Sequence, residues 1–176
     1  MTVKRNLLIW QCAGFVTTVI GGILLHYLYG LTNESILAAP VSAVNESTWE
    51  HMKLMYFPMF AFALIQSRFF KEYDSFWCVK LFGMLTGLIL IPVLFYTYNG
   101  AFGESPAWLN IAIFFITAAI VFALETLLLK KNNLRCKQPW IPFIIICLIG
   151  TLFVLFTFAP PKIPLLQNPL TGLYGL

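Results

Sequence analysis

The residues best suited to chemistry gather in one short polar segment, residues 45–53, which reads Asn-Glu-Ser-Thr-Trp-Glu-His-Met-Lys. The chain has two histidines: His51 lies in this segment and His26 comes before it. On an α-helix, residues three or four apart share a face, so Glu46, Glu50 and Lys53 would lie together. A short connecting loop would then bring His26 next to His51 and Glu50.

Such a cluster predicts one of two kinds of chemistry. His26, Glu50 and His51 could bind a divalent metal ion with one open position, which makes such an ion the candidate cofactor. Without a metal, the same three side chains could serve as a general acid and base. In both cases the substrate would contact four further residues: Asn45, Glu46, Lys53 and Tyr174 of the C-terminal segment.

The same segment also has a structural interpretation. The residues from Ser47 to Glu50 match a capping box, in which Ser caps a helix and Glu reaches back to the cap. Glu50 suits the positive end of a helix dipole and could form a simple pair with Lys53. His26 is harder to explain in this way, because a histidine that faces lipid is costly and should face the bundle interior or water.

The elements that position these residues follow from composition. The chain has 176 residues, of which 60% are hydrophobic and 10% charged, whereas soluble domains carry about 25% charged residues. A membrane-crossing helix needs about 20 mostly apolar residues, and five stretches qualify: 7–29, 49–70, 76–98, 108–129 and 140–158. We therefore expect an all-α, polytopic membrane helix bundle, a single domain over residues 1–176 with an outer tail at 159–176.

The placement of cations predicts the orientation of this bundle. Lys and Arg concentrate on the cytoplasmic side of membrane proteins. Only Lys53 and Lys162 lie on one side of the predicted spans, whereas nine cations lie on the other: Lys4, Arg5, Arg68, Lys71, Lys80, Lys130, Lys131, Arg135 and Lys137. This predicts a cytoplasmic N-terminus and, with five spans, an extracytoplasmic C-terminus.

Glu125 is a carboxylate near the inner end of the predicted span 108–129. An intramembrane carboxylate normally faces a partner, and Lys80 and Arg68 lie at a matching depth on neighbouring spans. A proton or ion relay is the alternative, although the central spans lack the further carboxylates that a pathway would need.

The four cysteines predict no disulfide framework. They form no CxxC pair, and none falls in a segment placed outside, which also argues against a cysteine zinc site. They are Cys12, Cys78, Cys136 and Cys147.

The C-terminal tail has four prolines, which prevent it from continuing the last helix. Its leucines, Ile163 and Tyr174 make it too apolar to extend freely into water. We expect the tail to form an ordered cap over the extracytoplasmic end of the bundle, with turns at Asn168-Pro169 and Thr171-Gly172.

Two segments resemble a known family. One is residues 44–53, with His26 ahead of it, and the other is the tail, with Pro160-Pro161-Lys162-Ile163-Pro164-Leu165 followed by Asn168-Pro169-Leu170-Thr171-Gly172-Leu173-Tyr174-Gly175. In these motifs and in its layout the chain resembles small, uncharacterised multi-pass membrane proteins of Gram-positive bacteria. That family has no established activity, so the resemblance implies a bacterial membrane location and little else.

Three functions remain open from the sequence. The first is a membrane-embedded hydrolase or transferase that acts on a lipid or another amphiphile at the outer mouth. The second is a binding or transport protein for a small solute or lipid, with kinks at Pro58 and Pro92 framing a cavity. The third is an accessory or scaffold subunit. The expected partners are membrane lipids and a small-molecule or lipid ligand, and no segment predicts a nucleic-acid interface.

Overall fold

The computed structural model describes residues 2–103, 106–131, 134 and 136–176. Within them the chain forms five α-helices: α1 (Thr2–Leu31), α2 (Thr48–Ser67), α3 (Phe76–Phe102), α4 (Ala107–Lys131) and α5 (Trp140–Phe158). A short 3-10 helix, η1 (Pro164–Leu166), follows, and the described residues contain no β-strand. The all-α prediction is confirmed, and each of the five predicted segments is a helix. Arg135, one of the nine cations assigned to the inner side, lies outside the described residues.

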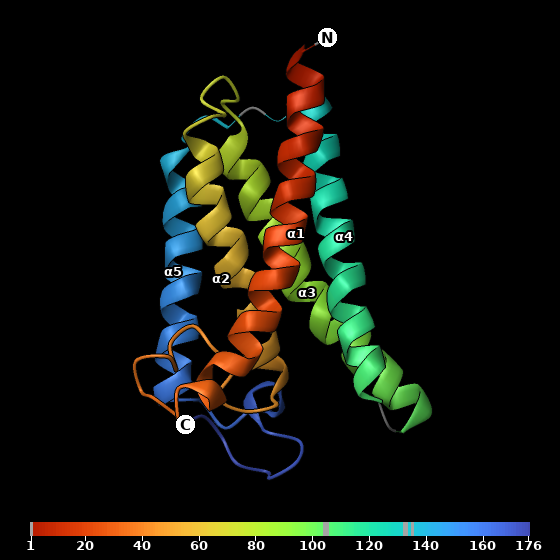
Figure 1. The fold of residues 1–176 in the computed structure, drawn as a ribbon, viewed down its shortest axis with the longest axis vertical. Coiled ribbons are helices and arrows are strands. Elements are labelled where there is room, and N and C mark those ends of the chain that lie inside the picture. Colours follow the sequence, from red (N-terminus) through yellow and green to blue (C-terminus); the bar gives the residue numbers. More distant parts are fainter. Residues whose placement is uncertain (1, 104–105, 132–133, 135) are drawn as a thin grey trace.

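The five helices run side by side along the long axis of the molecule (Figure 1). The N-terminus, the α2–α3 loop and the α4–α5 loop lie at one end, which we call the N-end. The α1–α2 loop, the α3–α4 loop and the C-terminal tail lie at the other, the C-end. The polar segment 45–53 and the tail therefore share one end of the bundle.

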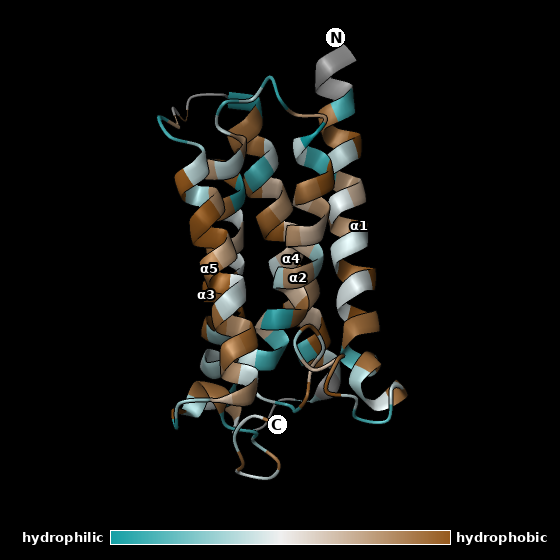
Figure 2. Cartoon of the chain, turned by 90° about the vertical axis from the view of Figure 1, so that its left-hand side faces the viewer, coloured by the Kyte–Doolittle hydropathy of each residue, from teal (hydrophilic) through white to brown (hydrophobic). Residues whose placement is uncertain are grey.

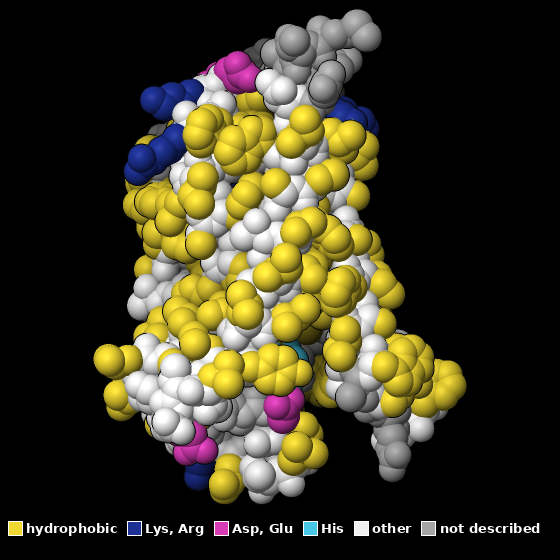
Figure 3. Space-filling model, in the orientation of Figure 1, with side chains coloured by type: hydrophobic (Ala, Val, Ile, Leu, Met, Phe, Trp, Pro, Cys, Tyr) yellow, Lys and Arg dark blue, Asp and Glu magenta, His cyan; other side chains and the backbone are white. Residues whose placement is uncertain are grey.

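Four helices are long and apolar enough to cross a membrane: Asn6–Leu31, Phe76–Phe102, Trp108–Lys131 and Trp140–Phe158. Their outward surfaces carry large apolar side chains such as Leu24, Ile89 and Leu148. Hydrophobic side chains cover most of the height of the bundle (Figure 3), and the loops at the two ends mix hydrophilic and hydrophobic residues (Figure 2). These apolar helices are compatible with a multi-pass membrane protein.

α2 is less apolar than the other four helices and occupies the middle of the bundle. It packs against α1, α3, α5 and η1, and most of its side chains are buried, including Glu50, Lys53 and Gln66. Because neighbouring helices cover most of its surface, α2 needs less apolar outer surface than the other helices. Its composition alone does not qualify it as a membrane span.

Close packing around α2 depends on small residues of its neighbours. A Cβ on Gly21 would collide with Pro58, so α1 can approach the proline of α2 closely. On α3, a Cβ on Gly87 would collide with Met55 of α2. The GxxxG spacing of α3 thus serves contacts within the chain.

An ion pair joins α3 to α4 in the half of the bundle near the N-end. Lys80 Nζ lies 2.6 Å from Glu125 Oε2, and both side chains are buried. A Cβ on Gly83 would collide with Glu125, so glycine there makes room for the carboxylate. The prediction that Glu125 faces a cationic partner is confirmed, and that partner is Lys80.

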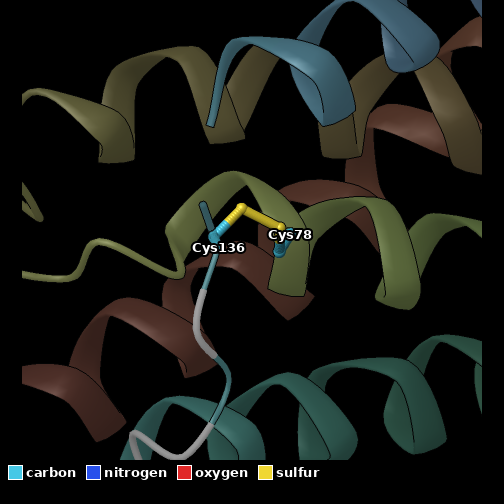
Figure 4. Close-up of a disulfide and its surroundings, with 2 residues drawn as sticks. All are labelled: Cys78 and Cys136. Atoms are coloured by element: carbon cyan, nitrogen blue, oxygen red, sulfur yellow. A yellow bond between two sulfur atoms is a disulfide. The ribbon is translucent and has the colours of Figure 1, made fainter. Parts of the chain in front are cut away.

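A disulfide ties the α4–α5 loop to the first turns of α3 (Figure 4). It joins Cys78 to Cys136, whose Cα atoms lie 6.1 Å apart although 58 residues separate them in the sequence. The expectation of no disulfide was wrong, because cysteine spacing does not reveal that this loop folds back onto α3. Cys12 and Cys147 are free.

Candidate functional site

The polar segment 45–53 divides at the start of α2. Ser47 is the N-cap, and its Oγ accepts a hydrogen bond from Glu50 N at 3.4 Å. Asn45 Oδ1 accepts a hydrogen bond from Ser47 N at 2.9 Å. In a capping box the side chain of Glu50 would accept this bond. Glu46 precedes the cap and is not on the helix, so it does not share a helical face with Glu50 as the spacing had suggested.

Glu50 and Lys53 form a buried ion pair in the first turns of α2. Lys53 Nζ lies 2.6 Å from Glu50 Oε2, and the side-chain exposures are 0% and 2%. Lys53 Nζ also donates to Ala39 O and Thr157 Oγ1, each at 2.9 Å, and Glu50 Oε2 accepts from Val44 N at 3.1 Å. An ammonium group has three donors, so no donor of Lys53 is left for a substrate.

The two histidines lie next to each other at the C-end. The ring centroids of His26 on α1 and His51 on α2 are 5.6 Å apart. His51 Nδ1 lies 2.9 Å from Ser47 O, and its Nε2 lies 3.5 Å from Glu46 Oε2. Since a carbonyl oxygen only accepts, Nδ1 carries the hydrogen in this contact. Nε2 is then the ring atom left to exchange a proton beside Glu46.

A cavity of about 950 Å³ opens beside this cluster. Figure 3 shows the face of the molecule hollowed towards its lower end, with a histidine at the edge of the hollow. The lining of the cavity is mostly apolar and also includes polar side chains, one carboxylate and part of the tail. The lining residues are Glu46, Thr48, His51, Ile91, Phe95, Tyr96, Asn99, Gly103, Asn110, Ile113, Phe114, Pro169 and Leu170. An apolar cavity with a few polar groups is typical of a small-molecule site.

Four polar lining residues were not among the predicted site residues: Thr48, Tyr96, Asn99 and Asn110. Asn110 Oδ1 is buried and has no hydrogen-bond partner among the described residues. The signal that could have found Asn110 is a polar amide within an apolar helix, which should face a partner or a cavity.

The floor of the cavity is apolar. Ile91 on α3 lines the cavity. One turn along α3 towards the N-end lies Gly87, where a Cβ would touch Met55 and Val121. One turn further along α3, Gly83 lies against Glu125. Met55 and Val121 are buried. A layer of core side chains therefore separates the cavity from the Lys80–Glu125 pair.

The tail is folded across the C-end, which confirms the prediction of an ordered cap. Asn45 Nδ2 donates to Gly175 O at 2.9 Å, and Leu176 N donates to Thr157 O at 3.1 Å. Gln167 and Tyr174 form an antiparallel β-bridge. Tyr174 is not among the residues that line the cavity, and both polar ends of the Asn45 side chain are used within the chain.

The predicted site residues therefore separate into two groups. His26, His51 and Glu46 come together beside the cavity, whereas Glu50 turns away to pair with Lys53. Among the described residues, no group of three or more His, Cys, Asp or Glu side chains is placed to hold a metal ion. The acid–base form of the site requires only the neighbours that His51 has here, Glu46 and His26.

Comparison with known proteins places the whole chain in one family. No curated protein and no solved structure matches the sequence. One family model, described as a family of unknown function (DUF6512), matches residues 2–176. The chain therefore belongs to this family of unknown function, DUF6512.

Proposed function

We propose that this protein is a bacterial plasma-membrane protein with five spans, its N-end in the cytoplasm and its C-end outside. Support comes from exposed cations at the N-end: Arg68, Lys71, Lys130, Lys131 and Lys137. At the C-end Lys53 is buried in an ion pair, so Lys162 is the exposed Lys or Arg there among the described residues. Exposed cations favour the cytoplasmic side.

Single cysteines test this orientation. In a background without native cysteines, Lys162→Cys is expected to react with a membrane-impermeant maleimide on intact cells, because it lies at the C-end. Lys131→Cys is expected to react only after the membrane is permeabilised. The reverse pattern of labelling would show that the bundle is inserted the other way round.

We further propose that the cavity binds a lipid or another amphiphile and that His51 transfers protons in a hydrolysis or group-transfer reaction. The observation that carries this proposal is the position of His51, between the carboxylate of Glu46 and a cavity with apolar walls. Phe95, Ile113 and Phe114 would contact the apolar part of the ligand. Asn110 and Thr48 would hydrogen-bond its polar group.

The proposed chemistry uses the two nitrogens of His51 differently. The contact of Nδ1 with Ser47 O holds the ring in one orientation. Nε2 takes a proton from the attacking hydroxyl group and returns it to the leaving group. Glu46 stabilises the imidazolium that forms in between, and His26 packs against the ring and limits its movement. With water as the acceptor the reaction is hydrolysis, and with an alcohol it is transfer.

The test uses the purified full chain in vesicles made from total bacterial lipid extract, with lipid products followed by mass spectrometry. We expect His51→Gln to slow product formation by about 10²–10⁴-fold, the usual contribution of a general acid or base. The variant should still retain lipid, because the cavity walls are unchanged. The matched control is Thr171→Ala, which changes an exposed tail residue that does not itself line the cavity.

Two outcomes would contradict the proposal. Equal product formation by wild type and His51→Gln would remove the acid–base role. If no lipid stays bound to wild type through purification in mild detergent, the amphiphile site itself would be wrong. Transport is the weaker alternative, because the layer formed by Met55 and Val121 closes the cavity towards the N-end.

A further inference from the structure

The Cys78–Cys136 pair lies at the end of the bundle where exposed cations concentrate. Cys78 is in the first turns of α3, and Cys136 is in the α4–α5 loop beside the exposed Lys137. Both cysteines are half-buried, so neither is enclosed in the apolar core. Cations next to a cysteine favour the thiolate, the form that takes part in disulfide exchange.

The compartment in which this cysteine pair lies decides whether a permanent disulfide is expected there. The inference rests on the orientation proposed above, which places the N-end in the cytoplasm. Disulfides are rare in the cytosol, where small thiols and thioredoxin-type proteins keep cysteines reduced, and those that form there are usually transient, catalytic or redox-sensing. A permanent structural disulfide at this position would conflict with the compartment.

We propose that Cys78 and Cys136 form a reversible redox site on the cytoplasmic face. Its co-reactant is a low-molecular-weight disulfide or a thioredoxin-type protein disulfide. One protein thiolate attacks that disulfide, forms a mixed disulfide and releases one thiol. The second protein thiolate attacks the mixed disulfide, closes the Cys78–Cys136 bond and releases the second thiol. Two protein thiols are oxidised and one external disulfide is reduced to two thiols.

Closing the bond fastens the α4–α5 loop to α3. The Cα–Cα distance of 6.1 Å lies in the range found for disulfides, so the backbone arrangement suits the bond. In the reduced form this covalent link between the loop and α3 is lost. Exposed Lys131 and Lys137 flank the cysteine in this loop, so trypsin can report on whether the loop is held down.

The experiment equilibrates the purified full chain with a series of reduced-to-oxidised glutathione ratios and counts free thiols by maleimide mass shift. We expect Cys78 and Cys136 to pass together from reduced to oxidised within the series, while Cys12 and Cys147 stay free. Trypsin cleavage in the α4–α5 loop should be about tenfold slower in the oxidised form, because local opening is restricted. Cys78→Ser should abolish both changes, and Cys147→Ser, which removes a free thiol, should leave them intact.

The possible failures point to different errors. If no glutathione ratio produces the bond, the redox site is wrong while the orientation stands. A second measurement traps thiols by acid in growing cells and repeats the count after an impermeant reductant. A disulfide that is fully formed in the cells and is opened by that reductant from outside would overturn both the redox site and the proposed orientation.

Discussion

Replacing Lys80 with methionine is expected to lower the free energy of unfolding by about 3–5 kcal/mol, the usual cost of breaking a buried ion pair on one side. The substitution leaves the Glu125 carboxylate buried among apolar helices without its cation, 2.6 Å from where the ammonium had been. Glu125 Oε1 already lacks a hydrogen-bond partner among the described residues. Unfolding by sodium dodecyl sulfate in mixed micelles, followed by tryptophan fluorescence, would measure the loss.

Two further variants show whether the loss comes from the pair. The double variant Lys80→Met with Glu125→Met should recover most of the stability, because well-packed apolar residues often replace a buried ion pair at little cost. Arg68→Met is the matched control: Arg68 was the other candidate partner, it is exposed, and its removal should change stability by less than about 0.5 kcal/mol. If Arg68→Met costs as much as Lys80→Met, Glu125 is paired differently from what we describe.

Replacing Lys53 with methionine is expected to have an effect of similar size, again about 3–5 kcal/mol. Its ammonium holds Glu50 and also bonds Ala39 of the α1–α2 loop and Thr157 of α5. Because Leu176 N binds Thr157 O, the C-end should loosen together with the tail. Hydrogen exchange should therefore rise in residues 39–47 and 167–176 before it rises in the core.

The Lys53 variant also separates two interpretations of this residue. The sequence suggested that Lys53 binds substrate, whereas its three bonds give it a structural role. A structural lysine predicts lower stability in Lys53→Met and partial recovery in the double variant with Glu50→Met. Unchanged stability with loss of lipid binding would instead restore the substrate role. Lys162→Met removes an exposed cation at the same end and is the control.

The helices were predictable because their signals are local. The five predicted segments became five helices, four of which are long and apolar enough to cross a membrane. Ser47 became the N-cap of α2, as its position before Glu50 indicated. Glu125 pairs with Lys80 as predicted, because few cations lie within reach of a carboxylate in an apolar span. The tail became an ordered cap for a comparable reason, since apolar residues between prolines must pack somewhere.

The roles of the individual polar residues were not predictable in the same way. Glu46 and Glu50 have the same side chain, yet Glu46 lines the cavity, whereas Glu50 is buried in an ion pair with Lys53. The start of α2 and its rotation against α1, α3 and α5 decide between these positions. Cys78 and Cys136 became neighbours only because the α4–α5 loop folds back onto α3.

The sequence by itself determined that this protein is all-α, that apolar helices build it, and that the side chains best suited to chemistry gather in the polar segment 45–53. Hydrophobicity and helix length act along a single segment, so they can be read from the chain. The sequence also predicted that His26 lies next to His51, which the structure confirms. The tertiary structure alone decided that Glu46 rather than Glu50 joins the two histidines, and that Asn110 lines the same cavity. These contacts join residues distant in the chain, and they depend on how neighbouring helices rotate and pack, which no single segment encodes.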